Sequence, residues 1–260
     1  AYYNDEVIVP ALQNRGLTLE DAREYNIIGC VEPQKSGKTN GWHDAAFFNM
    51  CRPLELVFAN GMDKGVQVGI QTGDVTKMNT FNEFYDAYKK QMEYCISLMV
   101  NADNAIDVAH AERCPLPFLA SMVDDCLTRG LTAEQGGAVY NFTGPQGFGI
   151  ANMADSLYAI RKLVYEDKKV SMETYKEALA WNYDKGLDEK SVADMSEMIL
   201  KGMQDAGMPL NEDTAKAVLQ TVMRLKPSDE QIQKFTELHD MIDEVPKFGN
   251  AIDDVDYFAR

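Results

Sequence analysis

The chain has 260 residues, of which 45% are hydrophobic and 25% are charged, and its net charge is −16 at pH 7. This composition is typical of globular proteins, which excludes a disordered chain, and the length fits one large domain or two smaller ones. The acidity argues against nucleic acids and anionic membranes as partners, and no apolar run is long enough to span a membrane.

The N-terminal part predicts short elements separated by turns. The apolar run 7–9, which precedes a proline, predicts the end of a strand. Residues 17–25 predict a short helix with Thr18 as its N-cap. Residues 26–28 then continue as an extended segment, and the composition of 33–41 predicts a loop.

Helical spacing dominates the middle of the chain. Apolar residues over 42–60 recur as on a helix, with Pro53 as a kink or a second start. Residues 66–70 alternate between apolar and polar, which indicates a strand or a hairpin arm. Residues 79–80 precede a long helix with one apolar stripe, which Pro115 ends.

The remainder predicts further helices, so the chain is expected to be mainly helical with few strands. Residues 184–242 are more polar than the rest and are expected to face solvent. The helices are predicted near 118–129, 150–166 and 171–183, with two or three charged, amphipathic ones between 189 and 242, and residues 247–250 predict a turn.

A Gly-rich stretch from Gly136 to Gly149 separates two of these helices. Gly144, Gly147 and Gly149 stand directly before the second helix, where backbone N–H groups can hold a phosphate. The spacing matches neither GxGxxG nor a Walker A motif, and no clear strand precedes it. We therefore interpret the stretch as a tight turn that packs the start of a helix.

Five cysteines, at positions 30, 51, 95, 114 and 126, form no Cys-x-x-Cys pair and no spacing typical of a metal site. We therefore expect reduced thiols in a cytoplasmic protein, with no bound metal. The chain begins without a methionine and ends within a starting helix. It is expected to be an interior piece of a longer protein.

The run Gly29-Cys30-Val31-Glu32-Pro33 carries the candidate chemistry. Alternate residues of an extended segment share a face, so the Cys30 thiol and the Glu32 carboxylate are expected side by side. Gly29 leaves room for a turn, and Pro33 stiffens the exit. The pair alone also fits a structural cysteine beside a solvated glutamate.

Glu32 discriminates between two kinds of cysteine chemistry. A nucleophilic Cys30 would need a nearby base, for which His43 is the local candidate. A neighbouring carboxylate disfavours a thiolate, however, so Glu32 suits a thiol that loses a hydrogen atom rather than a proton.

Four blocks resemble the glycyl radical enzyme family, of the pyruvate formate-lyase type. They occur in the family's order and are residues 25–34 (YNIIGCVEPQ), 41–49 (GWHDAAFFN), 140–152 (YNFTGPQGFGIAN) and 247–250 (KFGN). The resemblance implies an α/β fold, a ten-stranded barrel of two half-barrels with the cysteine loop, here residues 26–41, reaching into its centre.

The resemblance also implies a domain layout. Residues 1–260 would form an interior portion of one barrel domain, with a helical outer layer over about 79–245. The N-terminal part and the C-terminal glycyl radical domain are expected to lie outside this chain. Residues 1–260 alone are therefore expected to be inactive, and turnover by them would refute that expectation.

In the family, a glycine near the C-terminus becomes a stable radical that takes a hydrogen atom from the loop cysteine. By resemblance, Cys30 is the thiyl residue, and Glu32 is the proton-transfer residue, with a pKa that burial tunes toward neutral pH. No cofactor is expected within the chain itself. The implied partners are a small-molecule substrate, a radical S-adenosylmethionine activating enzyme with an iron–sulfur cluster, and a second copy in a homodimer. The implied setting is anaerobic metabolism in the cytoplasm or in a bacterial microcompartment.

Three residues after the loop indicate the branch of the family. Asp44 resembles the aspartate that binds a substrate hydroxyl in glycerol and propane-1,2-diol dehydratases, and a carboxylate accepts the two hydrogen bonds of a diol. His43 and Phe47 are expected as further substrate contacts, and choline trimethylamine-lyases differ at both positions. Asp44 could instead cap the following helix, and His43 could face solvent.

Other readings stay open. The length of 184–242 leaves room for a sulfonate C–S lyase or an arylacetate decarboxylase. The chain could also be a truncated, non-catalytic partner of a full-length subunit, in which case a stop codon would follow Arg260. A plain thiol enzyme would instead have a Cys30 that alkylates readily at neutral pH.

Overall fold

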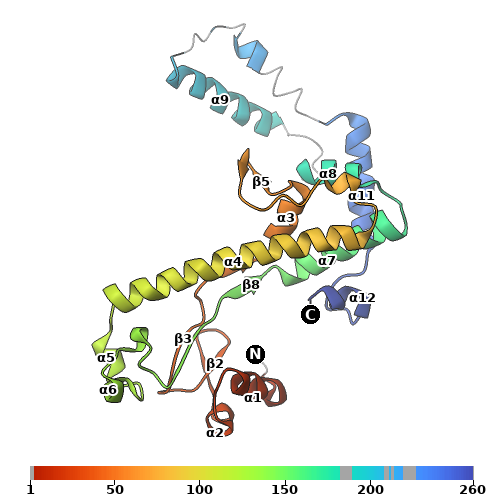
Figure 1. Ribbon diagram of the computed structural model, residues 1–260. Helices are drawn as coiled ribbons and strands as arrows, with labels where there is room; N and C mark the ends of the chain where they lie inside the picture. The colour runs from red at the N-terminus through yellow and green to blue at the C-terminus, as the bar shows by residue number, and fades with distance from the viewer. Residues whose placement is uncertain (1–2, 182–188, 208–210, 212–213, 219–226, 260) are drawn as a thin grey trace. The chain divides into compact units, whose positions relative to one another are not determined.

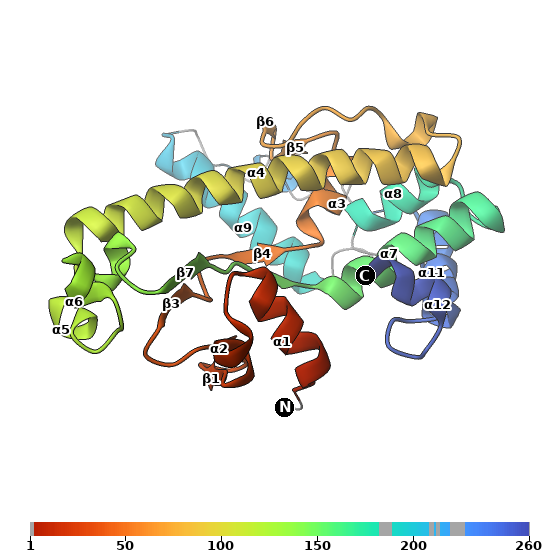
Figure 2. The ribbon, with the colours of Figure 1, turned by 60° about the horizontal axis from the view of Figure 1, so that its bottom comes forward.

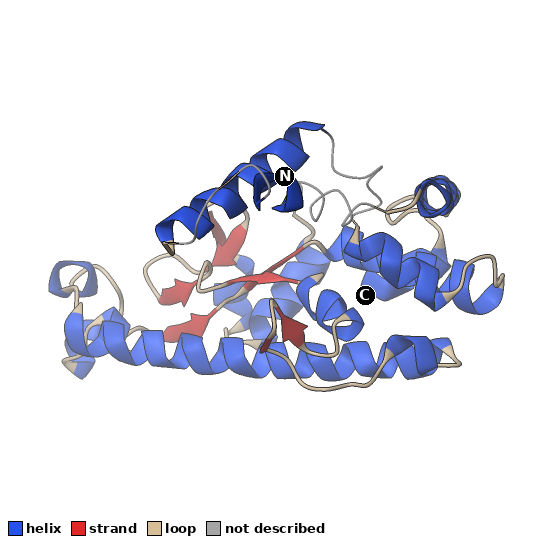
Figure 3. Cartoon of the chain, turned by 90° about the horizontal axis from the view of Figure 1, so that it is seen from above, coloured by secondary structure: helices blue, strands red, loops and turns tan. Residues whose placement is uncertain are grey.

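The computed structural model describes residues 3–181, 189–207, 211, 214–218 and 227–259 (Figure 1). Contacts within the chain divide it into two compact units: unit 1 is Ala1–Leu54 with Lys89–Ile150, and unit 2 is Glu55–Tyr88 with Ala151–Arg260. Helices dominate the described residues and the strands are short (Figure 3), which confirms the prediction of a mainly helical α/β chain. Its place as an interior portion of one domain stays a prediction.

Unit 1 holds most of the strands. In chain order its elements are α1 (Asp5–Asn14), α2 (Leu19–Arg23), β1 (Asn26–Ile28), β2 (Glu32–Gln34), β3 (Thr39–Trp42), β4 (Phe47–Asn49), the part of α4 (Phe81–Arg113) from Lys89 onward, α5 (Pro117–Ala120), α6 (Cys126–Arg129), the 3₁₀ helix η2 (Ala133–Gln135), β7 (Tyr140–Thr143) and β8 (Gln146–Phe148).

Three strand pairs organise this unit (Figures 1 and 2). β1 and β2 form an antiparallel hairpin, β3 runs parallel to β7, and β4 runs parallel to β8. In the described residues these pairs remain separate two-stranded ladders and do not close into one sheet. The parallel pairs bring two of the sequence blocks with family resemblance, 41–49 and 140–152, into contact.

The two parallel ladders are out of step by two residues. Trp42 pairs with Thr143 and Phe47 pairs with Gln146, so residues 43–46 on one side face only residues 144–145 on the other. Backbone hydrogen bonds close the gap at both ends, from the Gly144 N–H to the Trp42 carbonyl and from the Gln146 N–H to the Ala46 carbonyl. The longer side must bulge out of the ladder, which redirects its side chains.

A buried carboxylate ties α2 to the start of these strands. Asp21 is 6% exposed, and it accepts hydrogen bonds from Lys38 Nζ at 2.8 Å and from the Tyr140 hydroxyl at 2.6 Å. These bonds, the Lys38 bond first, hold the pKa of Asp21 below its usual 3.8 although burial opposes the shift. Thr18 caps α2 by accepting from the Asp21 N–H, as the sequence predicted.

The predicted strand end at 7–9 is wrong, because these residues lie inside α1. Asn4 caps that helix by accepting from the Glu6 N–H, and acidic residues fill its first turn. Ile8 and Val9 pack on Leu12 and its buried neighbours. A short apolar run has no period that separates strand from helix, so the local cap and the packing decide.

The helix predicted over 42–60 is also wrong in its first half. Trp42 ends β3, residues 47–49 form β4, and α3 (Arg52–Phe58) begins only at the predicted second start near Pro53. The Gly-rich stretch 136–149 was expected to be a turn, but it contains β7 and β8. In both segments the strands exist because each pairs with a distant partner. The single helix predicted over 118–129 is two short ones, α5 and α6.

Unit 2 is almost entirely helical. Besides α3 from Glu55 onward and the start of α4, it contains β5 (Met62–Asp63), β6 (Val66–Gln67), the 3₁₀ helix η1 (Val75–Lys77), α7 (Ile150–Ile160, from Ala151 onward), a π-helical continuation (Arg161–Glu166), α8 (Met172–Ala180), α9 (Glu189–Asp205), α11 (Asp229–Glu244), α12 (Asp253–Asp256) and the 3₁₀ helix η4 (Tyr257–Ala259).

Aromatic rings fill the core of this unit. Phe84 is fully buried and its ring lies 5.6 Å from that of Phe58, which stacks at 6.1 Å on Tyr175. The hairpin arm predicted at 66–70 is present as the short pair β5–β6, and the turn at 247–250 is confirmed. The predicted helices between 189 and 242 are found as α9 and α11, and residues 208–210, 212–213 and 219–226 lie outside the described residues.

Among the described helices, none combines the length and the apolar character that crossing a membrane requires.

The Asp21 network gives a test of the fold. Replacing Tyr140 by Phe removes the hydroxyl that donates to Asp21, and we expect the free energy of unfolding to fall by about 1–2 kcal/mol at pH 7. Because the folded-state pKa of Asp21 is depressed, this contribution is present above about pH 4 and is lost as the pH falls through that lowered pKa. Urea unfolding between pH 7 and pH 3 measures both effects.

Tyr25→Phe is the matched control. The Tyr25 hydroxyl also donates to an aspartate, Asp5, at 2.8 Å, but this bond is exposed. We expect Tyr25→Phe to change the free energy of unfolding by less than about 0.5 kcal/mol. Equal losses in the two variants would contradict a structural role for the Asp21 network.

Candidate functional site

Cys30 lies at the tip of the β1–β2 hairpin. Residues 29–31 connect the two strands, and Ile28 pairs with Glu32 across the turn. The expectation that Cys30 and Glu32 share a face of one extended strand is therefore wrong, because the chain reverses direction between them. Gly29 adopts φ +59°, a left-handed conformation that permits this reversal. The turn leaves Cys30 exposed.

The Glu32 carboxylate folds back beneath the same turn. Glu32 is buried, and its Oε2 accepts a hydrogen bond from the Val31 N–H at 2.9 Å. The Glu32 carboxylate thus lies close to the turn that carries Cys30 because backbone N–H groups bind it, and not because the two side chains alternate along one strand.

The electrostatics of Glu32 run opposite to the sequence-based expectation. The hydrogen bond from the Val31 N–H is the largest influence, the N–H groups of Glu32 and Cys30 and the charge of His43 add to it, and together they hold the pKa of Glu32 below its usual 4.5. Burial opposes this shift but is outweighed. Glu32 is therefore a carboxylate at neutral pH and is ready to accept a proton.

Gly29 is required for this arrangement. A Cβ at position 29 would lie 2.6 Å from Glu32 Oε2, closer than real contacts allow. The glycine therefore supplies both the positive φ and the space that the carboxylate occupies.

The bulge at 43–46 delivers the second carboxylate. His43 and Asp44 lie in this turn between β3 and β4, so neither is paired in a ladder. Asp44 is not the N-cap of a helix, because β4 follows it. The bulge aims Asp44 toward Gln146 at the start of β8.

Gln146 joins the two carboxylates. Its Nε2 donates to Glu32 Oε1 at 3.2 Å and also to Asp44 Oδ1. The structure thus brings Glu32 and Asp44 to one amide group. Gln146 was not predicted as a site residue, because the surrounding glycines were given a purely structural role. Its polar side chain between Pro145 and Gly147 was the available signal.

His43 lies beside this network. Its Nε2 is 3.4 Å from Gln34 Oε1, and its ring meets the Phe142 ring edge-on at 5.2 Å. A Cβ on Gly41 would lie 2.7 Å from His43 Nε2, so this glycine makes room for the imidazole. His43 therefore packs against protein on one side and does not simply face solvent.

Phe47 is the predicted site residue that the structure leaves apart. It begins β4, where its backbone pairs with Gln146, but its side chain is 66% exposed. Among the described residues, no hydrogen bond or ring contact joins that side chain to Glu32, Gln146 or Asp44. Its role as a substrate contact stays a prediction.

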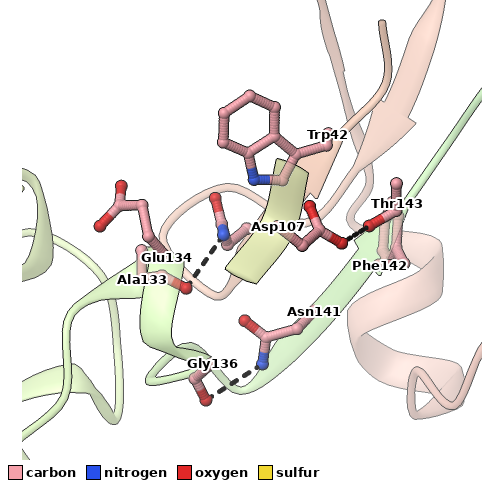
Figure 4. Close-up of a pocket in the computed structure, with 9 residues that line it drawn as sticks. Trp42, Asp107, Ala133, Glu134, Gly136, Asn141, Phe142 and Thr143 are labelled. Atoms are coloured by element: carbon pink, nitrogen blue, oxygen red, sulfur yellow. Dashed lines mark hydrogen bonds between the residues drawn. The ribbon is translucent and has the colours of Figure 1, made fainter. Parts of the chain in front are cut away.

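A separate hollow of about 270 Å³ lies against α4 and η2 (Figure 4). Thr143 donates to Asp107 at 2.7 Å along its wall, and the amide of Asn141 donates toward the carbonyl of Gly136. None of the predicted site residues lines it. The lining residues are Asn40, Trp42, Asp107, Ala133, Glu134, Gly136, Asn141, Phe142 and Thr143.

Comparisons with known proteins identify the family and the fold of the chain. A family model described as pyruvate formate lyase-like matches residues 1–260. A solved structure concerned with 1,2-propanediol dehydration in Roseburia inulinivorans is 57% identical over the whole chain, with a TM-score of 0.85. The glycerol-bound, B12-independent glycerol dehydratase from Clostridium butyricum is 45% identical over the whole chain, with a TM-score of 0.78.

Curated relatives match over shorter stretches. A (2S)-3-sulfopropanediol dehydratase from Klebsiella oxytoca is 38% identical over 171 residues, or 65% of this chain. The chain spans 21% of that relative, 31% of the Roseburia chain and 27% of the Clostridium chain. The two structural likenesses confirm the predicted fold class.

Gly29→Ala tests whether the turn at 29–31 holds the Glu32 carboxylate. The new methyl group would displace the Glu32 carboxylate from the Val31 N–H, so we expect the pKa of Glu32 to rise toward its usual value. The alanine would also cost about 1–2 kcal/mol of stability in its left-handed conformation. Infrared titration of the carboxylate band, with the spectrum of Glu32→Gln subtracted, measures the pKa.

Gly37→Ala separates the two effects. Gly37 has φ +74°, and a Cβ added there would meet no heavy atom within 4 Å, so the alanine carries the backbone cost alone. If the pKa of Glu32 shifts equally in both variants, or in neither, Gly29 does not provide the space in which the turn binds this carboxylate.

Proposed function

Because the chain belongs to the pyruvate formate lyase-like family of glycyl radical enzymes, we propose that it is part of a dehydratase that removes water from a small uncharged diol or polyol, such as propane-1,2-diol or glycerol. The observation that carries the proposal is the pair of carboxylates, Glu32 and Asp44, joined at Gln146 beside the exposed Cys30 turn. One carboxylate can accept a proton while the other binds a substrate hydroxyl.

Cys30 fits the role of the hydrogen-abstracting residue. It stands at a hairpin tip, where its thiol can meet groups on either side of the loop. In the full-length protein, a glycyl radical installed by a radical S-adenosylmethionine iron–sulfur enzyme would supply the oxidation of Cys30 to a thiyl. The residues of this chain then handle the substrate.

The dehydration can be written so that atoms and electrons balance. The Cys30 thiyl takes a hydrogen atom from the carbon that bears one hydroxyl, and Glu32 takes the proton of that hydroxyl. The neighbouring C–O bond breaks, and Glu32 returns its proton so that water leaves. The carbon radical of the resulting aldehyde takes the hydrogen atom back from the Cys30 thiol. The lowered pKa of Glu32 keeps the carboxylate ionised before the first step, while a pKa nearer neutral pH would make it a stronger base.

The local charge favours an uncharged substrate. Glu32 and Asp44 are both acids, and a sulfonate placed beside them would be repelled. A sulfonated diol is nevertheless the second candidate, because a 3-sulfopropanediol dehydratase is among the relatives. That substrate would need cationic side chains from elsewhere in the full-length protein.

The remaining parts of the proposal concern partners and setting. We propose that the full-length protein forms a homodimer, is activated by the radical enzyme named above, and works in the cytoplasm or in a bacterial microcompartment. The five free cysteines fit a reducing compartment.

Two substitutions test the roles of the pair in the activated full-length protein. We expect Cys30→Ser to abolish aldehyde formation, because an alcohol O–H bond is too strong to take part in the hydrogen-atom exchange. We expect Glu32→Gln to lower kcat/KM by about 10²- to 10⁴-fold. Cys114→Ser, at another exposed cysteine of unit 1, is the control and should retain full activity. An active Cys30→Ser protein would refute the proposal.

A substrate screen tests the branch. Propane-1,2-diol and glycerol should give higher kcat/KM than 3-sulfopropane-1,2-diol or isethionate, measured from the product formed. Asp44→Ala should raise KM for the diol by about 10- to 100-fold, since a charge-assisted hydrogen bond is lost. Preference for a sulfonate would move the assignment to the second candidate.

A further inference from the structure

Gln146 occupies a position that neither the family resemblance nor the proposed chemistry explains. It is the first residue of β8, and it reaches Glu32 and Asp44, which lie 114 and 102 residues earlier in the chain. The hydrogen bonds of a single amide nitrogen connect the cysteine hairpin with the bulge between β3 and β4. Among the described residues no other side chain donates a hydrogen bond to both carboxylates.

The Gln146 amide is chemically suited to lie between two carboxylates. An amide NH₂ has two hydrogens and no charge, so it can donate one hydrogen to each carboxylate. A lysine would neutralise one of the acids, and a glutamate would repel both. Glutamine instead leaves Glu32 and Asp44 as anions and offsets part of their mutual repulsion.

The backbone holds this side chain in place. The Gln146 N–H donates to the Ala46 carbonyl at 2.8 Å, and Gln146 pairs with Phe47 at the start of the β4–β8 ladder. Gly147 follows, and a Cβ there would lie 3.3 Å from Met50 Sδ, so the ladder packs closely. The bulge that delivers Asp44 and the residue that binds it are thus set by one strand register.

We propose that Gln146 is a positioning residue that holds the proton-transfer carboxylate and the substrate-binding carboxylate at a fixed separation. The inference rests on the proposed function for the roles of Glu32 and Asp44. Its consequence is that the hydroxyl bound by Asp44 and the hydroxyl deprotonated by Glu32 are presented in one fixed relative position. Gln146 itself does not react.

Two nearly isosteric substitutions test the proposal in the full-length protein. Gln146→Met removes both hydrogen bonds, and Gln146→Glu replaces the donor by a third carboxylate. We expect kcat/KM for the diol to fall by about 100-fold in each, because a small misplacement of reacting groups costs that much. Most of the loss should lie in kcat rather than in KM, because the substrate still meets Asp44.

A second readout is independent of turnover. In the unactivated protein, infrared titration should place the pKa of Glu32 higher in both variants than in the wild type, and higher in Gln146→Glu than in Gln146→Met. The other groups that act on Glu32 are the His43 imidazole and the N–H groups of the turn, and Asp44 shares the Gln146 donor with it. All of these groups are unchanged in both variants. Gln13→Glu, which adds the same charge on exposed α1, should leave turnover and titration unchanged.

The outcomes separate the two proposals. An unmoved Glu32 titration in both variants, together with wild-type kcat, would overturn the role of Gln146 while leaving the dehydratase assignment in place. If the pKa of Glu32 is raised in the Gln146 variants but the wild-type protein dehydrates no diol, the positioning role of Gln146 is supported and the proposed function is refuted. The titration needs only folded, unactivated protein, so if one variant unfolds, the titration and kcat of the other decide the question.

Discussion

The two-residue excess of 43–46 over 144–145 is the constraint on which the site of unit 1 depends. The ladders on either side are both parallel, so the extra residues cannot be absorbed by pairing and must leave the sheet. They carry His43 and Asp44 with them. The same register starts β8 at Gln146, opposite Phe47, and so places the amide next to the bulge.

The electrostatics of the site follow from this geometry. Glu32 is buried, which by itself would favour the neutral acid, yet the turn supplies N–H groups that favour the anion. The hydrogen bonds prevail because they contact the charged oxygens directly. A second carboxylate close by would normally raise the free-energy cost of ionising Glu32. The Gln146 amide, which donates to both carboxylates, reduces that cost.

Local signals predicted those elements that local interactions decide. The Thr18 cap, the long helix from Phe81 to Arg113 and the turn at 247–250 each depend on neighbours within a few residues, and each was found. The failures share a different cause. Residues 47–49 form a strand because they pair with 146–148, and residues 140–143 form one because they pair with 39–42. This pairing overrode the helical period that the sequence shows over 42–60.

The sequence by itself determined the family, because contiguous blocks of residues carry the resemblance. It also determined that Cys30 and Glu32 lie close together, because they are two residues apart in one of these blocks. It also contained Gln146, but gave it no role. The tertiary structure decided how the pair is held, the direction of the Glu32 pKa shift and the link to Asp44. The physical reason is that these features depend on where N–H groups point. In a turn that direction is set by a positive φ, and across the site it is set by the register of strands far apart in the chain.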